Sequence, residues 1–152
     1  MLTDNLKLNE LILAINKLSK ESKPKWGKMN CSQMLWHCRR FIIFYLNESE
    51  YSPNIFTYSL GALHMCFLKY VIRWNYRIYP KNTPSLKFFD ASLKIDIDFE
   101  YEKKSLLKIL NVVNDLKKEF VINPMHGKVS RKILKEVVRG HTSYHLIQFG
   151  VL

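Results

Sequence analysis

The sequence has little cysteine, glycine and proline. It contains three, five and five of them in 152 residues. Three cysteines are an odd number, and Cys31, Cys38 and Cys66 have no close-paired metal spacing, so reduced thiols are expected and a disulfide framework is disfavoured. The scarcity of glycine and proline excludes collagen-like and low-complexity chains.

Long apolar runs are also lacking. The longest unbroken run, Phe41 to Leu46, is far shorter than the roughly 20 residues that a membrane-spanning helix needs. The first residues lack the basic start and apolar stretch of a secretion signal. The sequence therefore predicts a soluble, cytoplasmic protein with no membrane span.

Acidic residues are scarce, with 13 Asp and Glu against 24 Lys and Arg, which gives a net charge of +11. Such a balance suggests binding to nucleic acid or to an anionic surface. The basic residues are spread, however, with 8 in residues 1–40, 5 in 41–90 and 11 in 91–152. No known nucleic-acid motif accompanies them, so nucleic acid is disfavoured as a partner.

Apolar residues make up 47% of the chain, enough for the core of one domain over residues 1–152. They recur every three or four residues in four segments, which predicts helices over about 4–20, 30–47, 100–119 and 130–148. Asn30 and Gln33 have the spacing of a capping box, and Ser130 is placed to cap the last helix.

The middle of the chain is less regular. Residues 55–79 predict an irregular helical crossover, after which Pro80 and Pro84 interrupt the chain. Residues 93–100 alternate between apolar and polar, but no second alternating segment is available to pair with them. Because a lone strand is not stable, an extended connection is expected there.

Three histidines fall on the buried faces of predicted helices. His141 and His145 are four residues apart and therefore lie on one face of a helix, about one turn from each other. His37 lies on the apolar stripe of the second helix, and antiparallel packing of the two helices brings all three rings level. Three converging imidazoles with an open fourth position suit a divalent metal ion such as zinc, nickel or iron. The alternative is that the pair is accidental, since spacing four alone is a weak motif.

Two stretches of the sequence, each containing a histidine of this set, resemble a known family. Trp26 to Asn30 followed by Gln33, Met34, Leu35 and His37, together with a tail that ends His145-Leu-Ile-Gln-Phe-Gly150, resembles the two signatures of the DinB/YfiT-like superfamily of metal-dependent helical-bundle proteins. The similarity is greatest to an uncharacterised bacterial branch.

The resemblance implies an all-α, up-down-down-up four-helix bundle with a long, partly helical crossover between its second and third helices. It implies a histidine triad that corresponds to His37, His141 and His145. This chain has Asn123, Thr142 and Tyr144 where many relatives have His, Asp and His. Those departures put the hydrogen-bond support of the imidazoles in doubt.

Several other residues have two interpretations. Gln33 and Gln148 lie one turn from triad members and could orient the imidazoles, although capping explains Gln33 equally well. Tyr144 could orient a substrate or simply pack. Gly140 could let another element approach the site. His64 and His126 fall outside the triad, and packing is favoured for Cys38. These seven residues are not among the proposed ligands.

We therefore expect a metal-dependent enzyme of uncharacterised activity that acts on a small-molecule substrate. The family resemblance implies thiol-dependent S-transferase-like chemistry, with no protein nucleophile identified. Two alternatives remain: a non-catalytic basic binding module for nucleic acid or an anionic surface, and a scaffold homodimer with a vestigial site. Function is carried by sites and not by folds.

Overall fold

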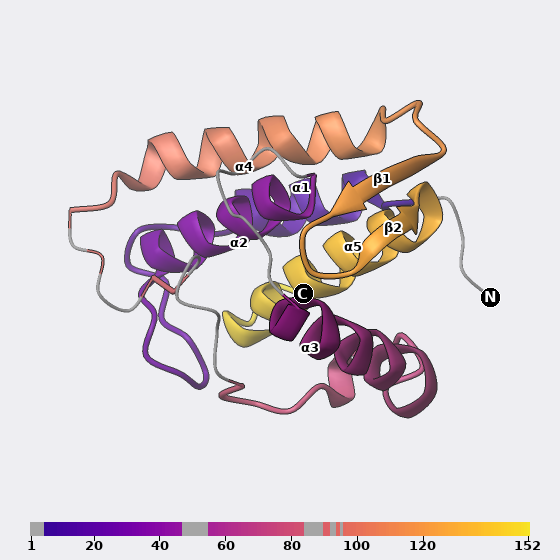
Figure 1. Cartoon of the computed structure of the whole chain (residues 1–152). Coiled ribbons are helices and arrows are strands. Elements are labelled where there is room, and N and C mark those ends of the chain that lie inside the picture. The colour runs from indigo at the N-terminus through magenta and orange to yellow at the C-terminus, as the bar shows by residue number, and fades with distance from the viewer. Residues whose placement is uncertain (1–4, 47–54, 84–89, 92–93, 95) are drawn as a thin grey trace.

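The computed structural model describes residues 5–46, 55–83, 90–91, 94 and 96–152, and within these the chain is mostly helical (Figure 1). The helices are α1 (Leu8–Asn16), α2 (Cys31–Tyr45), α3 (Ile55–Cys66), α4 (Phe99–Asn114) and α5 (Arg131–Gln148). A π-helical segment, η1 (Phe67–Val71), continues α3, and a short 3-10 helix, η2 (Tyr76–Ile78), follows it. Two strands, β1 (Phe120–Asn123) and β2 (Gly127–Ser130), separate α4 from α5.

The core lies between four helices. Helix α2 packs against α4 and α5, and α1 packs against the same two helices. Leu11 and Ile15 of α1, Leu106 of α4 and Leu134 of α5 are fully buried there. Helix α3 lies on the opposite side of the molecule from α4 (Figure 1). This layout places α2 beside α5, the two helices that carry the predicted histidine triad.

The helix starts follow the expected capping chemistry. The Asn30 side chain accepts a hydrogen bond from the Gln33 backbone N–H at 2.9 Å, and the Gln33 side chain accepts one from the Asn30 N–H at 2.9 Å. The Ser130 hydroxyl accepts from the Ile133 N–H. These bonds satisfy helix N–H groups that have no partner within the helix. They fix the first turn of α2 and of α5, and with it the angular position of each histidine.

The β-hairpin corrects the predicted fold class. Strands β1 and β2 pair antiparallel, from Phe120 opposite Ser130 to Asn123 opposite Gly127. The prediction of an all-α, up-down-down-up four-helix bundle is therefore wrong. Strand β1 was not predicted from the sequence because it is apolar on both faces. Val121 is buried, whereas the apolar residues Phe120 and Ile122 are 42% and 57% exposed. Alternation of apolar and polar residues, the usual signal of a half-buried strand, is absent from these four residues.

Other boundaries are also shorter than predicted. Helix α1 covers only part of the 4–20 segment, because Lys7 adopts a left-handed conformation with φ 52° immediately before it. Helix α4 begins at Phe99 and ends at Asn114, so Phe99 and Glu100 are helical rather than extended. Residues 93 and 95 of the alternating segment, and residues 4, 47 and 84, lie outside the described part of the chain. The irregular helical crossover expected over 55–79 is confirmed as α3, η1 and η2.

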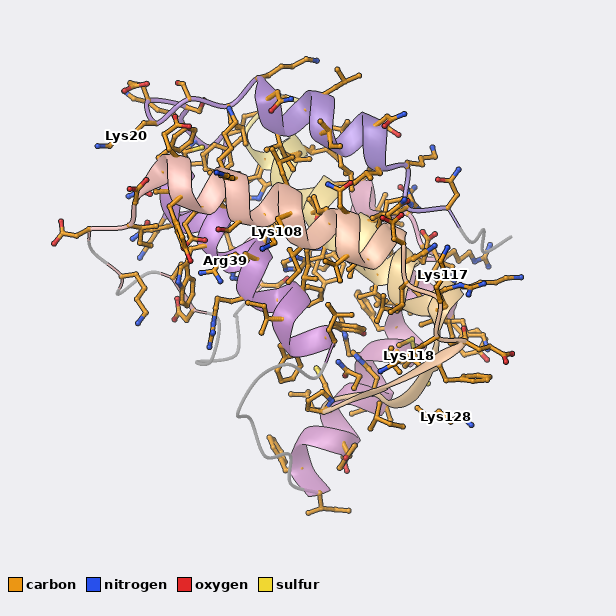
Figure 2. All side chains as sticks on the ribbon, turned by 90° about the horizontal axis from the view of Figure 1, so that it is seen from above. Lys20, Arg39, Lys108, Lys117, Lys118 and Lys128 are labelled. Atoms are coloured by element: carbon orange, nitrogen blue, oxygen red, sulfur yellow. The ribbon has the colours of Figure 1, made fainter. Side chains whose placement is uncertain are left out.

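The basic side chains labelled in Figure 2 are spread over the molecule. In Figure 2, Lys20 lies near one end of the molecule and Lys128 near the other, with Lys108 on α4 between them. This spread agrees with the sequence, in which each of the three segments 1–40, 41–90 and 91–152 contains basic residues. Within the described residues, no helix is both long enough and apolar enough to cross a membrane.

Candidate metal centre

The structure brings together the three histidines that the sequence singles out. His37 comes from the middle of α2, and His141 and His145 come from the last half of α5. His37 and His145 are buried, at 2% and 7% exposure, and His141 is half-buried. One ring nitrogen from each lies within 4.8 Å of the other two. Among the described residues this is the one group of three or more such side chains that could hold a metal ion.

The three rings lie close together, with two of the pairs edge-on and one tilted. The Nε2 atoms of His37 and His141 are 3.1 Å apart, and the ring centroids of all three pairs are 4.8 to 4.9 Å apart. The ring of Phe41 stacks on His141 with a centroid distance of 3.7 Å and an angle of 7°. Phe41 therefore fixes the plane of His141 and forms one apolar wall of the group.

Gln148 determines which nitrogen of His145 is available. Its Nε2 donates to the Trp26 carbonyl at 2.6 Å, so its Oε1 is the atom that lies 2.8 Å from His145 Nδ1. An amide oxygen can only accept, so neutral His145 carries its hydrogen on Nδ1. The lone pair is then on Nε2. Gln148 thus holds His145 in the tautomer that a metal ligand requires.

The electrostatics of the group favour neutral rings. Burial, followed by the neighbouring His37, lowers the pKa of His145 to about 3. Burial, followed by His145 and His37, also lowers the pKa of His141 well below its usual value near 6.5. Nδ1 of His141 is buried with no hydrogen-bond partner among the described residues. Neutral imidazoles in an apolar setting offer lone pairs rather than charge, and such nitrogens are good ligands for a divalent cation.

Two neighbours of the group have other roles. Gln33 bonds to Asn30 and donates to the Lys94 carbonyl at 2.9 Å, so it is a capping residue that also anchors the segment before α4. Tyr144 lies beside the group, with its ring edge-on to His145 at 5.1 Å. Its hydroxyl donates to the Pro80 carbonyl and accepts from the Trp26 indole. Tyr144 therefore ties the chain after η2 to the side of the histidine group.

Gly140 allows the crossover to approach the site. A Cβ atom at this position would lie 1.8 Å from Cε2 of the Tyr76 ring, closer than any real contact. Tyr76 of η2 thus rests directly on the α5 backbone next to His141. The interpretation that Gly140 admits another element is confirmed. Cys38 is buried and its Sγ contacts the Met34 sulfur at 3.8 Å, as packing rather than ligation predicts.

A second group of titratable side chains lies outside the triad. The Tyr45 hydroxyl is 2.5 Å from His126 Nδ1, His126 Nε2 is 3.3 Å from His64 Nδ1, and His64 Nε2 is 3.3 Å from the Tyr79 hydroxyl. Both histidines were predicted to lie outside the triad. Their meeting depends on the path of the crossover, because they are 62 residues apart. No local spacing signals it.

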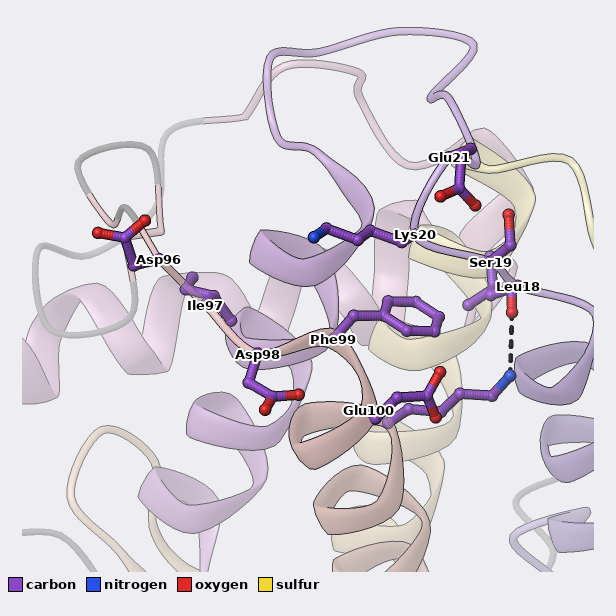
Figure 3. A pocket seen from close by; sticks show the side chains of 10 residues that line it. Leu18, Ser19, Lys20, Glu21, Asp96, Ile97, Asp98, Phe99 and Glu100 are labelled. Carbon is purple, nitrogen blue, oxygen red and sulfur yellow. Dashed lines mark hydrogen bonds between the residues drawn. The ribbon is translucent and has the colours of Figure 1, made fainter.

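One pocket of the described chain lies away from the histidine group. It lies between the loop after α1 and the start of α4 (Figure 3). Glu21, Asp96, Asp98 and Glu100 are on its rim, and Lys103 donates to the Leu18 carbonyl at its edge. None of the histidines is among its lining residues. No polar side chain that lines this pocket is both buried and unpaired among the described residues. The start of α4 explains the acidic rim, because carboxylates interact favourably with the helix dipole there.

Comparison of the chain with protein-family models, with curated proteins and with solved structures finds no significant match. The case for any function therefore rests on the geometry of the histidine group.

Proposed function

We propose that this protein binds a divalent metal ion through His37, His141 and His145 and acts with it on a small-molecule substrate. The observation that carries the proposal is the Gln148 amide, which is fixed by Trp26 and presents an acceptor to His145 Nδ1. A purely structural histidine does not need a particular nitrogen free. Here the fixed tautomer leaves the Nε2 lone pair of His145 available, on a ring that belongs to a group of three.

The resemblance of the two sequence signatures supports membership of the DinB/YfiT-like superfamily, which we include in the proposal. Three nitrogen ligands with a remaining open position are typical of catalytic rather than structural zinc, and imidazole also suits nickel and iron. A bound divalent ion supplies Lewis acidity and lowers the pKa of a water or thiol that reaches it.

The side chains around the group have definable tasks. Phe41 and the buried rings exclude water from one side, which strengthens electrostatic interactions within the group. His141 is the most exposed of the three histidines. Tyr144 flanks His145 with both hydroxyl bonds made to Trp26 and Pro80. We assign no nucleophile to the protein and propose a thiol as the substrate class.

The experiment is elemental analysis and cobalt titration of protein without a histidine tag. We expect one divalent ion per chain in the wild type. We expect loss of that ion in His145→Ala, and retention in His126→Gln, which changes a histidine outside the group. Gln148→Leu keeps all three ligands but removes the acceptor from His145, so affinity should fall about 10- to 100-fold.

Two results would overturn the proposal. One is a wild type that binds no stoichiometric divalent ion at micromolar concentration. The other is equal binding by the wild type and His145→Ala, because the ion would then be held elsewhere. Small thiols are the first substrates to screen with the metal-loaded protein.

A further inference from the structure

The second titratable group forms one continuous hydrogen-bonded chain. It runs from Tyr45 on α2 through His126 in the hairpin turn and His64 on α3 to Tyr79 after η2. Asn123 holds its centre, because the Asn123 Oδ1 accepts the backbone N–H of His126 at 2.8 Å. Side chains from four separate parts of the sequence therefore converge on three consecutive hydrogen bonds.

Counting hydrogens determines the direction of this chain. Two phenols and two neutral imidazoles carry four exchangeable hydrogens, one on each side chain. Three of them fill the three links, so one is left over, at one end or the other. Both histidines are neutral at pH 7, since burial lowers the pKa of His64, and burial followed by His64 lowers that of His126 to about 3.

Burial decides which end keeps the extra hydrogen. Tyr45 is 0% exposed, and His126 is the one hydrogen-bond partner of its hydroxyl among the described residues. A Tyr45 hydroxyl that only accepted would leave its own hydrogen buried and unpaired, which is costly. Tyr45 therefore donates to His126, His126 donates to His64, and His64 donates to Tyr79. The leftover hydrogen is on Tyr79, which is half-buried and can reach another acceptor.

Tyr79 lies next to the candidate metal centre. Its ring is edge-on to Tyr144 at 5.6 Å, and Tyr144 is edge-on to His145 at 5.1 Å. One aromatic ring thus separates Tyr79 from a triad histidine. A small molecule that binds at the histidine group must therefore extend past Tyr144 to meet Tyr79.

We infer that Tyr79 is the hydrogen-bond donor for an oxygen anion that a thiol ligand of this centre carries beyond Tyr144. His64, His126 and Tyr45 are positioning residues, which supply the hydrogen that Tyr79 accepts and so leave its own hydroxyl hydrogen for the ligand. This inference rests on the proposed function. A donor whose oxygen also accepts a hydrogen bond is strengthened, because linked hydrogen bonds polarise one another.

The test uses cobalt-loaded protein titrated with 3-mercaptopropionate, a thiol that carries a carboxylate, followed by the visible absorption of the cobalt. Hydrogen bonds to charged groups contribute enough that Tyr79→Phe should weaken thiol binding about tenfold or more. Cobalt affinity itself should not change, because Tyr79 is not a ligand. Tyr70→Phe removes the hydroxyl of a tyrosine that is 65% exposed and should bind the thiol like the wild type.

Two outcomes distinguish a failure of the proposed role of Tyr79 from a failure of the proposed metal binding. Cobalt bound normally with equal thiol affinity in the wild type and Tyr79→Phe overturns the role of Tyr79 and leaves the metal site standing. A wild type that takes up no cobalt overturns both.

The direction of the chain has its own measurement, which needs no metal. Long-range 1H–15N NMR spectra of the metal-free wild type should show His64 and His126 both protonated on Nε2. Protonation of both on Nδ1 means that Tyr79 donates into the chain and has no hydrogen to give, which overturns the inference.

Discussion

Replacing Gly140 by alanine tests how the crossover docks beside the histidine group. In an exposed helix interior, glycine to alanine stabilises by about 1 kcal/mol through helix propensity alone. At this position the new Cβ lies 1.8, 2.0 and 2.2 Å from three atoms of the Tyr76 ring. The ring is 8% exposed and cannot turn aside without leaving its packing. Inserting volume into a filled site costs about 1 to 3 kcal/mol, and expelling a buried aromatic ring costs about 3 to 5.

The clash therefore outweighs propensity. Because the ring must leave its packing, we expect Gly140→Ala to lower the free energy of unfolding by about 2 to 4 kcal/mol, the cost of expelling the ring less the gain in propensity. Urea denaturation followed by circular dichroism measures it. The matched control is the same substitution in a Tyr76→Ala background, where only propensity remains and the sign should reverse to a gain of about 1 kcal/mol. Stabilisation by Gly140→Ala in the wild-type background would show that Tyr76 does not rest on α5, and would refute the reasoning.

Two further predictions concern buried titratable groups. Burial and then His64 lower the pKa of His126 to about 3, so the unfolded chain binds a proton below pH 6.5 that the folded chain refuses, and stability should fall as the pH drops from 6.5 towards 3. The urea midpoint should fall less between pH 7 and pH 5 in His126→Gln than in the wild type. An equal fall in both proteins would contradict the lowered pKa of His126. Arg39 makes a two-point ion pair with Glu102, at 2.6 and 2.9 Å, and Glu102 is 4% exposed. Arg39→Met should destabilise by about 3 to 5 kcal/mol because a buried carboxylate loses its partner, and Arg39→Met with Glu102→Met should recover most of that loss in thermal unfolding.

The helices were predictable because their signals are local. Apolar spacing of three and four residues placed α2 and α5 within a few residues, and the Asn30 and Ser130 caps fixed where each begins. Once both starts are known, the angular position of every later residue follows from the helix repeat. That is why one sequence could indicate His37, His141 and His145 as a converging set. It could not show the Gln148 amide fixed by Trp26, because those residues are 122 positions apart.

The hairpin and the second histidine chain share one cause of being missed. The hairpin turn is organised by Asn123, whose side chain accepts two backbone N–H groups and donates to carbonyls of α2. From the sequence, Asn123 and Pro124 predict only a turn. The turn places His126 against Tyr45, and the close approach of α3 at Gly61, where a Cβ would lie 1.9 Å from the Met125 carbonyl oxygen, brings His64 to His126.

Contacts of this kind join segments that have no shared periodicity, so the sequence of neither segment predicts the contact. The triad, by contrast, has two of its members on one helix. Their four-residue spacing alone predicts that these two histidines lie on the same face. The reliability of sequence reasoning on this chain therefore depends on whether one helix repeat relates the residues concerned. It is strong for groups that one helix repeat relates, and weak for a hydrogen-bonded chain whose four members come from α2, α3, the hairpin and the segment after η2.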